Sequence, residues 1–290
     1  MTEPAEVISE HMTWPDEARC AVLITVDLDA ELAILAADPS THDRVKTLSV
    51  GRYGATRGVE RLLGALDGVP STWFVPGLHA GLIREVLQAG HEIANHGHAH
   101  EDFDPLDLAG QLDAIRRGQD ALAEVTGSLP RGFRTPIGEW KPGLAAGLPA
   151  LGIDWSSSWR GDDLPYFHPS GLVEIPLQHE LEDHPYFMFN LDPPFPTGQS
   201  RIAPYAAVLE NWTQEFDAYH RFGLCYVLRL QPEVIGTPGR IALLRSLLSV
   251  MRERPGVWFA TGSQVADHWR ATRTGNEPGH PADVFAELTS

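Results

Sequence analysis

The chain has 290 residues, of which 43% are hydrophobic and 21% are charged, and its formal net charge is −17. It is long enough to bury one large core or two small ones, and its composition is that of an ordinary globular protein. The strong negative charge argues against nucleic acid and against anionic membrane surfaces as partners.

Short apolar runs alternate with longer segments of helical periodicity through most of the chain. The expected strands are residues 20–26, 71–75, 92–94, 132–134, 153–155, 172–175, 224–230 and 257–259. The expected helices are residues 54–66, 79–89, 105–125, about 142–151, 205–222, 238–252 and 263–270. Near-continuous apolar strands that alternate with helices indicate a parallel sheet covered by helices. Seven or eight such units in about 250 residues favour a barrel, whose sites form at the carboxyl ends of its strands.

The sequence shows no segment that would direct it to a membrane or out of the cell. Residues 1–19 are acidic on balance and lack the regions of a signal peptide, and no stretch approaches a transmembrane span. Cys20 and Cys225 are the only cysteines, and both lie in apolar runs, so we expect buried free thiols. We therefore predict a cytoplasmic protein whose substrate is present inside a cell.

Two aspartates follow the first expected strand. Asp27 and Asp29 are two residues apart at a strand end, so their side chains point to one face. One carboxylate could bind a metal ion while the other takes a proton from a metal-bound water. The alternative is that both are helix-capping or loop acids without a chemical role.

Two histidines follow the third expected strand. His96 and His100 are four residues apart, and their imidazoles can approach one metal ion if the segment makes a helical turn. His98 lies between them and should point elsewhere, either to the surroundings of the ligands or to solvent. The alternative for His96 and His100 is a pair of surface histidines that bind no metal.

Together these residues form a ligand set typical of hydrolytic metal sites. The carboxylate of Asp29 and the imidazoles of His96 and His100 would occupy three positions of a divalent metal and leave one open to water. We therefore expect a divalent metal cofactor. Neutral imidazole makes zinc the first candidate, and the same ligands would tolerate nickel, cobalt, iron or manganese.

Residues 156–201 are rich in Pro, Asp and aromatic residues and have the length of a functional insertion. Aromatic residues are concentrated between residues 140 and 190, namely Trp140, Trp155, Trp159, Tyr166, Phe167, Tyr186, Phe187 and Phe189. Their rings could line a site for a ring-shaped substrate, although packing in the core or between subunits is the stronger interpretation for most of them. Exposed rings here would also suit a homo-oligomer whose interface closes over the site.

Over roughly residues 20–270, the chain resembles the polysaccharide deacetylase superfamily, also called NodB-homology proteins or carbohydrate esterase family four. Residues 27–31 are similar to the first motif in its variant with one residue between the aspartates. That variant marks a cytoplasmic branch of peptidoglycan deacetylase-like and cyclic-imide-hydrolysing proteins. Residues 96–100 match the family's H-x-x-x-H, and residues 132–136 match its R-x-P. Residues 153–157 and 161–166 also look like this branch.

The resemblance implies an α/β fold, a distorted parallel (β/α) barrel of the deacetylase type. We expect a single domain of residues 1–290 with its core at about residues 20–270. By resemblance, Asp29, His96 and His100 bind the metal, and Asp27 is the general base. Arg134 would pair with Asp27 and keep it ionised and oriented. The alternative for Arg134 is a salt bridge at the rim, which would contribute little.

The chain departs from the family at the last motif. Residues 228–232 read Leu-Arg-Leu-Gln-Pro, so Gln231 stands where the family has the histidine that acts as general acid. A glutamine can donate a hydrogen bond but cannot transfer a proton at neutral pH. Because general acid catalysis is typically worth ~10²–10⁴-fold, amide hydrolysis should be impaired unless another group substitutes. His179, His184 or Asp27 itself could supply the proton.

We therefore predict a metal-dependent hydrolase of non-peptide carbon–nitrogen bonds that acts on a small molecule or a carbohydrate. One expected substrate is an N-acetylated sugar or a related amide. The alternative is a cyclic imide, whose second carbonyl stabilises the departing nitrogen without a proton donor. A third interpretation is a catalytically impaired protein that binds a ligand, because Gln231 replaces the usual acid.

Overall fold

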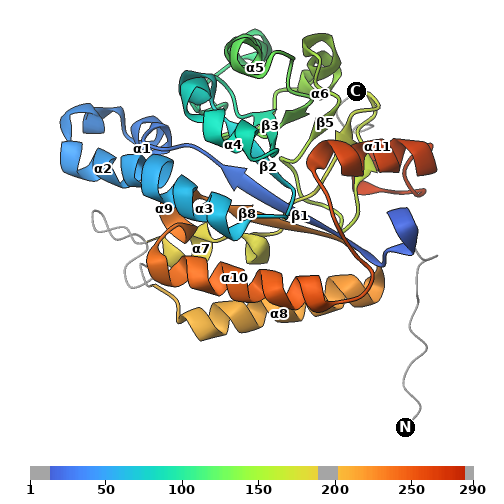
Figure 1. The fold of residues 1–290 in the computed structure, drawn as a ribbon. Coiled ribbons are helices and arrows are strands. Elements are labelled where there is room, and N and C mark those ends of the chain that lie inside the picture. Colours follow the sequence, from blue (N-terminus) through green and yellow to red (C-terminus); the bar gives the residue numbers. More distant parts are fainter. Residues whose placement is uncertain (1–13, 189–201, 285–290) are drawn as a thin grey trace.

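The computed structural model describes residues 14–188 and 202–284, and these residues form one sheet of nine strands (Figure 1). The strands are β1 Cys20–Asp27, β2 Ser71–Val75, β3 Glu92–Asn95, β4 Gly132–Phe133, β5 Trp155–Ser156, β6 Tyr166–Phe167, β7 Val173–Glu174, β8 Cys225–Leu230 and β9 Val257–Phe259. Their order is β6-β7-β5-β4-β3-β2-β1-β8, and β9 also pairs with β1. The pairs are parallel except for β6 with β7.

Strand β1 organises the sheet because three strands pair with it. Strand β8 pairs with residues 21–26 along one edge of β1. On the other edge, β2 pairs with residues 24–27 and β9 pairs with residues 20–22, so the sheet divides there. The result is a half-barrel covered by helices, and the predicted distorted (β/α) barrel fold is confirmed.

Most of the helices follow a strand and return the chain to the start of the next one. They are α1 Leu32–Ala37, α2 Val45–Tyr53, α3 Val59–Ala65, α4 Arg84–Gln88, α5 Leu108–Thr126, α6 Leu144–Gly147, α7 His184–Phe187, α8 Tyr205–Phe222, α9 Pro232–Ile235, α10 Pro238–Glu253 and α11 Gly262–Thr272. Strands β2 and β9 and helix α8 begin and end where the sequence predicts. The prediction was best where a segment has a continuous apolar run or a clear apolar stripe.

Helices α1 and α2 were not predicted. The expected helix at residues 54–66 is the later part of a longer helical stretch, in which a π-helical segment, Gly54–Gly58, joins α2 to α3. Helix α2 escaped prediction because its apolar side chains do not form a buried stripe. Val45 and Val50 are 74% and 44% exposed, so the periodicity that marks an amphipathic helix is missing.

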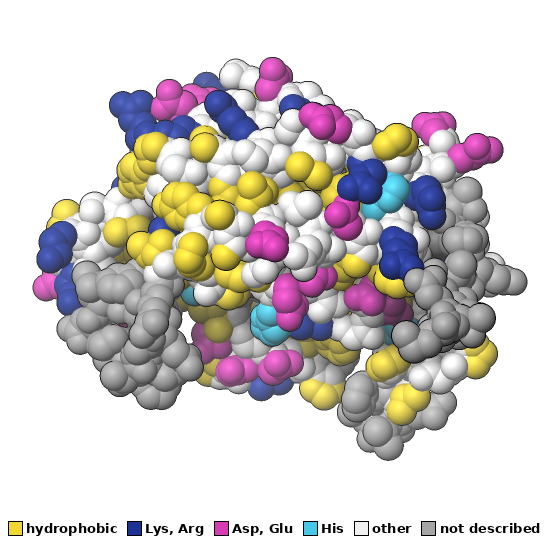
Figure 2. Space-filling model, turned by 90° about the horizontal axis from the view of Figure 1, so that it is seen from below, with side chains coloured by type: hydrophobic (Ala, Val, Ile, Leu, Met, Phe, Trp, Pro, Cys, Tyr) yellow, Lys and Arg dark blue, Asp and Glu magenta, His cyan; other side chains and the backbone are white. Residues whose placement is uncertain are grey.

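Helices α8 and α10 pack side by side and, with α3, α4 and the end of α5, cover the face of the sheet that carries the largest cluster of buried apolar residues (Figure 1). Helix α11 contributes to the second cluster, on the opposite face. The face seen from the side of α8 and α10 carries a band of hydrophobic side chains with acidic and basic ones around it (Figure 2). No helix in residues 14–188 and 202–284 is long and apolar enough to cross a membrane.

The alternation of β1 determines which of its side chains reach the candidate site. Cys20, Val22, Ile24 and Val26 point into the large cluster under α8 and α10. Residues 21 and 23 point the other way, into a second cluster. With a side-chain period of two, residues 25, 27 and 29 continue on this second face. Polar side chains therefore replace apolar ones on one face as β1 reaches its carboxyl end.

The segment at residues 156–188 is more regular than the predicted insertion. It contains β6, β7 and α7, and residues 189–201, including Phe189, lie outside the described residues. Among the expected aromatics, Trp155, Tyr166 and Phe187 are at most 3% exposed. For these three rings, packing in the core is the interpretation that holds. Cys20 and Cys225 are free and buried, as expected.

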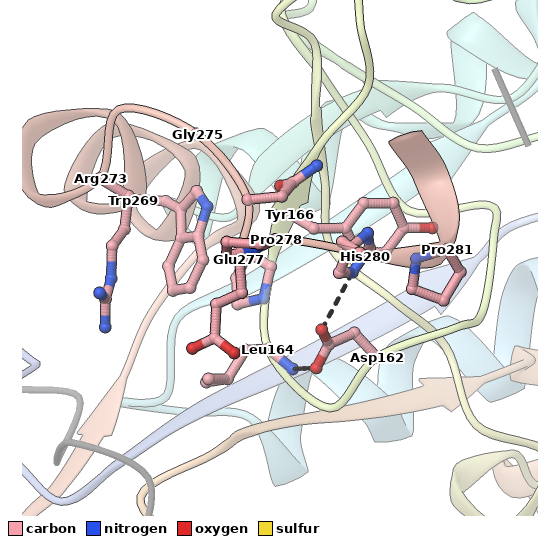
Figure 3. Close-up of a pocket in the computed structure, with 13 residues that line it drawn as sticks. Asp162, Leu164, Tyr166, Trp269, Arg273, Gly275, Glu277, Pro278, His280 and Pro281 are labelled. Carbon is pink, nitrogen blue, oxygen red and sulfur yellow. Dashed lines mark hydrogen bonds and ion pairs between the residues drawn. The ribbon is translucent and has the colours of Figure 1, made fainter. Parts of the chain in front are cut away.

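The described part of the C-terminal segment is fixed to the protein by hydrogen bonds. Asn276 accepts a hydrogen bond from the backbone N–H of Phe167 at 2.7 Å and donates one to its carbonyl at 2.8 Å. His280 contacts the carboxylate of Asp162 at 3.0 Å (Figure 3). The amide side chain of Asn276 thus pairs with the backbone of the edge strand β6 as another strand would. A cavity of about 280 Å³ lies under this segment, against Trp269.

Candidate metal centre and cleft

Four parallel strands bring the candidate residues to one edge of the sheet. Asp29 lies two residues beyond β1, and His96, Arg134 and Gln231 come directly after β3, β4 and β8. Because the carboxyl ends of neighbouring parallel strands lie together, residues more than a hundred positions apart become neighbours. This edge is where the sequence places the expected site.

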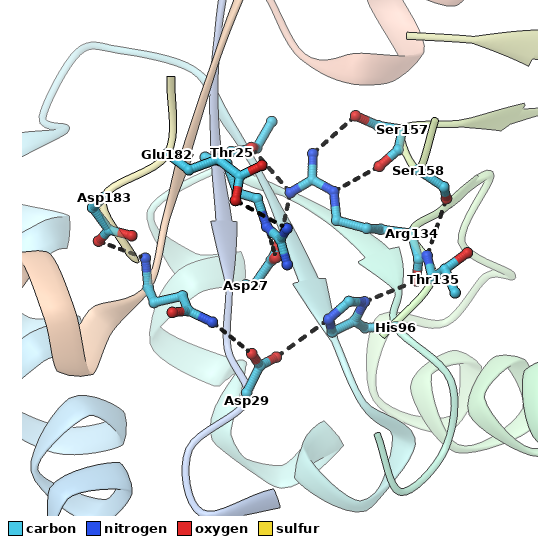
Figure 4. Close-up of polar contacts among 12 residues, drawn as sticks. Thr25, Asp27, Asp29, His96, Arg134, Thr135, Ser157, Ser158, Glu182 and Asp183 are labelled. Atoms are coloured by element: carbon cyan, nitrogen blue, oxygen red, sulfur yellow. Dashed lines mark hydrogen bonds and ion pairs between the residues drawn. The ribbon is translucent and has the colours of Figure 1, made fainter. Parts of the chain in front are cut away.

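Asp29, His96 and His100 lie together at the centre of the site, as predicted. Their ligand atoms are all within 4.8 Å of one another. Oδ1 of Asp29 is 3.3 Å from Nε2 of His96 (Figure 4). Oδ2 of Asp29 is 3.4 Å from Nε2 of His100. All three side chains are buried, with at most 4% exposed. The interpretation of His96 and His100 as unrelated surface histidines is therefore wrong.

The donor atoms fit a cation. Nδ1 of His96 lies 2.8 Å from the backbone carbonyl of Arg134, and since a carbonyl only accepts, this nitrogen carries the proton. Nε2 of His96 then presents a lone pair to Oδ1 of Asp29, and neither atom has a hydrogen-bond partner among the described residues. Two buried lone pairs that face each other are costly, and a divalent ion between them would satisfy both.

The protonation of these groups agrees with a ligand role. Burial lowers the pKa of His96 to about 4, so its ring is neutral at pH 7. Burial opposes ionisation of Asp29, but its interaction with protonated His100 outweighs burial and holds the pKa of Asp29 below its usual range, while the same interaction raises the pKa of His100. A neutral imidazole beside an ionised carboxylate is the form in which these side chains bind metals.

The two histidines do not meet through a helical turn. Residues 96–100 form an open bend, in which Gly97 has a φ of 72° and His100 a φ of 58°. A non-glycine residue in this left-handed region is uncommon and costs of order 1–2 kcal/mol. The bend turns the chain back on itself, so residues four apart converge without a helix.

Helix α5 holds this bend in place from behind. The side chain of Asn95 accepts from the N–H of Gly97 at 2.7 Å and donates to the carbonyl of Ile115 at 2.9 Å. Gly118 of α5 lies so close that a Cβ there would be 2.3 Å from the carbonyl oxygen of Gly97. His98 also turns toward this region, where its Nδ1 would be 2.6 Å from a Cβ on Gly77. His98 points away from the ligands, as expected.

Asp27 lies between two arginines. Oδ1 accepts from Nη1 of Arg134 at 2.6 Å, and Oδ2 accepts from Nε of Arg229 at 2.5 Å (Figure 4). Burial works against ionisation, but the two guanidinium charges outweigh it and lower the pKa of Asp27. Arg134 is 1% exposed and also donates to Ser157 and Thr25, so it is a buried, fully bonded cation and not a rim salt bridge.

Arg229 was missed by the sequence analysis. It is the one charged residue of β8, whose other side chains are apolar or aromatic. A charge inside an otherwise apolar strand is a signal that could have revealed it, because an unpaired buried charge is too costly to keep.

Gln231 contacts the candidate ligand set directly. Its Nε2 donates to Oδ2 of Asp29 at 3.1 Å, and its backbone N–H donates to Oδ2 of Asp183 at 2.9 Å. The side-chain amide therefore faces the position that a metal would occupy. The amide of Gln231 can donate a hydrogen bond there, but it cannot transfer a proton at neutral pH.

A cleft of about 330 Å³ opens beside these residues, and Asp29, His100, Arg229 and Gln231 contribute to its wall. His184 of α7 also lines it, and burial together with the charge of Arg229 lowers the pKa of His184. The volume is at the lower end of the range for small-molecule sites. Of the two histidines that the sequence offered as substitute acids, His184 therefore reaches the cleft. His179 does not line it, is 69% exposed and contacts Arg160.

Two glycines in the helical stretch of residues 45–65 allow its backbone to approach the loops that follow β1 and β8. A Cβ on Gly51 would lie 2.3 Å from the carbonyl carbon of Ala30, and one on Gly58 would lie 2.3 Å from the carbonyl oxygen of Pro232. The backbones thus touch next to Asp29 and next to Gln231. The contact of Gly51 comes from α2, which was not predicted, and the contact of Gly58 comes from the expected helix at residues 54–66.

Comparison with known proteins agrees with this arrangement. A family model described as polysaccharide deacetylase matches residues 53–155, a stretch that contains His96, His100 and Arg134. The crystal structure of a candidate polysaccharide deacetylase from Mycobacterium smegmatis is 37% identical, covers 93% of this chain and 98% of its own, and has a TM-score of 0.85. The chain belongs to the polysaccharide deacetylase family.

Two further similar proteins are a curated deacetylase and an allantoinase of known structure. A peptidoglycan deacetylase of Helicobacter pylori is 24% identical over 277 residues, which are 83% of this chain and 93% of that protein. An allantoinase of known structure has a TM-score of 0.77 with 23% identity over 91% of this chain and 95% of its own, and shares the fold. Family membership makes the chain a polysaccharide deacetylase-like hydrolase, and deacetylases of this family are generally metal-dependent.

Proposed function

We propose that the chain is a metal-dependent hydrolase of non-peptide carbon–nitrogen bonds, and that its best substrate is a small cyclic amide such as an imide. The observation that carries the choice of substrate is the contact of Gln231 with Asp29, which puts a side chain without a transferable proton beside the ligand set. The small volume of the cleft supports a compact substrate over a polymer.

Asp29, His96 and His100 are the proposed ligands, with zinc as the first candidate metal. A divalent ion held there would lower the pKa of a bound water and polarise the scissile carbonyl. The paired lone pairs on Asp29 and His96 support this assignment, since nothing else in the described part of the chain satisfies them. The carbonyl of Arg134 supports it further by holding the His96 ring in the required tautomer.

Asp27 is the proposed proton acceptor for the attacking water. Arg134 and Arg229 keep it ionised, as their contacts at 2.6 and 2.5 Å indicate. Each carboxylate oxygen accepts one of these hydrogen bonds and has a second lone pair left for a proton. A base with a lowered pKa is weak, so Asp27 suits a water that is already activated.

Gln231 limits which leaving groups can be expelled, because it cannot supply a proton. An ordinary amide releases a strongly basic nitrogen, which needs a proton as the bond breaks. In a cyclic imide, the second carbonyl shares the charge of the departing nitrogen, so a hydrogen bond can replace a proton donor. We propose that Gln231 positions the leaving group.

A second candidate is hydrolysis of an N-acetylated sugar. The relative from Mycobacterium smegmatis, which is 37% identical and is described as a candidate polysaccharide deacetylase, favours it. In this case another group must protonate the nitrogen, and His184 lines the cleft without being one of the proposed ligands. A third class is a ligand-binding protein without catalysis, which would follow if no donor replaces the missing histidine.

One substrate panel separates these functions. The purified protein is loaded with zinc, cobalt or manganese and assayed for ring opening of succinimide and hydantoin and for acetate release from N-acetylated sugars. Ring opening with intact acetamido sugars supports the first proposal, and acetate release supports the second. No turnover with any of the metals would leave the binding function. Light scattering on the same sample tests the proposed homo-oligomer, and a monomer would contradict it.

A further inference from the structure

Arg229 is a cation in the wall of the cleft that the proposed mechanism does not fully use. Its side chain is 21% exposed and lines the same cleft as Asp29, His100 and Gln231. Burial lowers the pKa of Arg229, but the carboxylates of Asp27 and Glu182 outweigh this effect and raise it. The guanidinium is therefore charged at every pH at which the protein is folded.

Only part of this guanidinium is occupied by the protein. Nε donates to Asp27 at 2.5 Å, while Nη1 approaches Glu182 at the long distance of 3.4 Å. Glu182 has a closer partner in Arg160, whose Nη2 is 2.9 Å from its other oxygen. Nη2 of Arg229 donates no hydrogen bond to residues 14–188 or 202–284. At least one strong donor of this cleft-lining residue therefore has no partner among the described residues.

The strand places this donor beside the leaving group. Arg229 and Gln231 are two residues apart at the end of β8, so their side chains share a face and their Cα atoms are separated by roughly 7 Å. Gln231 reaches Oδ2 of Asp29 at 3.1 Å, so it marks the centre of the site. A carbonyl attached to the departing nitrogen and pointing along β8 would meet Arg229.

We infer that Arg229 selects substrates with a second carbonyl beside the scissile one, by donating from its free Nη2 to the oxygen of that second carbonyl. The inference rests on the proposed function and names the residue that determines its substrate class. Charge-assisted hydrogen bonds of this kind are about twice as strong as neutral ones.

The chemistry balances with one water and no other reactant. The oxygen of water bonds to the scissile carbonyl carbon, and the carbon–nitrogen bond breaks with its electron pair going to nitrogen. That charge is shared with the second carbonyl oxygen, where the guanidinium of Arg229 stabilises it. One proton of the water ends on nitrogen by way of Asp27 or solvent, and the other leaves when the new carboxyl group ionises.

A binding experiment tests the contact without relying on turnover. Succinamate, the ring-opened product of succinimide, is compared with 4-methylpentanoate, which has the same shape but no amide group. Calorimetry on the metal-loaded wild-type protein should show that succinamate binds about 10-fold more tightly or better. In Arg229→Lys the two affinities should come within about threefold of each other. Arg160→Lys, which alters the other arginine on Glu182 outside the cleft, should keep the difference.

Two results would overturn the inference. Equal affinities of the wild-type protein for the two compounds would mean that nothing recognises the second carbonyl. An equal loss for both compounds in Arg229→Lys would mean that Arg229 only holds Asp27. The first comparison needs no variant, so it decides the question even if Arg229→Lys fails to fold.

Kinetics separate the inference from the proposed function. Arg229→Lys should lower kcat/KM on both substrates, because it alters the contact with Asp27, but the loss on succinimide should exceed the loss in any release of acetate from N-acetylated sugars by about 10-fold or more. Equal losses on both substrates would contradict a selective role. A wild-type protein that opens no cyclic imide would contradict the proposed function. The comparison of succinamate with 4-methylpentanoate would still test whether Arg229 recognises the second carbonyl.

Discussion

Nε2 of His96 and Oδ1 of Asp29 face each other at 3.3 Å, and both atoms are buried without a hydrogen-bond partner in the described part of the chain. The Arg134 carbonyl holds the proton of His96 on the other ring nitrogen, so no hydrogen bond can form between the two atoms. This pair is the reason to expect a cation, and it links the fold to the proposed chemistry.

His100→Asn should abolish stoichiometric metal binding while the fold persists. Asparagine tolerates the left-handed φ of 58° at this position, so the change removes the ligand without adding backbone strain. Losing a ligand should weaken metal binding by more than the 10–100-fold that is typical of outer contacts. Elemental analysis after dialysis measures the bound metal, and thermal unfolding checks the fold. His98→Asn is the matched control and should retain the metal. A full metal equivalent in His100→Asn would overturn the ligand assignment.

Gly118→Ala should weaken metal binding from outside the site. The added Cβ would lie 2.3 Å from the carbonyl oxygen of Gly97, so helix α5 or the bend that carries His96 and His100 must move. We expect a loss of about 1–3 kcal/mol in the free energy of unfolding and a measurable loss of metal affinity. Gly64→Ala is the control, because the nearest atom to its Cβ would be 3.7 Å away. Denaturant unfolding and metal titration of both variants make the comparison. Similar behaviour of the two would mean that the bend is not held by α5.

Gln231→His should raise kcat/KM on N-acetylated substrates more than on cyclic imides. The imidazole restores a group that can transfer a proton, a contribution typically worth ~10²–10⁴-fold, and an imide has less need of it. Steady-state kinetics on both substrates give the ratio. Gln178→His is the control, since Gln178 donates to Asp163 and does not line the cleft. An unchanged ratio in Gln231→His would mean that this position is not where the acid is missing.

Asp183→Asn should stabilise the metal-free protein increasingly as the pH rises. Burial raises the pKa of Asp183 well above its usual value, although the Gln231 N–H and Arg229 partly oppose this. The folded state therefore keeps a proton that the unfolded state loses above about pH 4. The contribution of Asp183 to stability is full below that pH and is lost as the pH rises through the folded-state pKa. Asparagine can still accept from Gln231 and does not ionise. Denaturant unfolding at several pH values measures the difference, and a constant difference would contradict the assignment.

The fold and the ligand set could be predicted because both depend on local patterns. Apolar runs marked β1, β2, β3 and β8 to within a residue or two, and the polar residues after β1 and β3 indicated Asp29, His96 and His100 as candidate ligands. Helix α2 could not be predicted, since Val45 is 74% exposed and its pattern shows no buried stripe. The bend at residues 96–100 could not be predicted either, because the contacts that hold Asn95 and Gly97 come from α5, which is distant along the chain.

By itself, the sequence predicted which strand ends carry candidate ligands and which donor atoms they offer, because periodicity and residue type act over a few residues. The resemblance to the family added that Gln231 stands where its members have a histidine. Only the tertiary structure decided that Arg229 shares Asp27 with Arg134 and that His184, not His179, reaches the cleft. Such relations depend on how far apart the strand ends and the loop lie in space, and the barrel sets these distances through contacts between residues far apart in the chain.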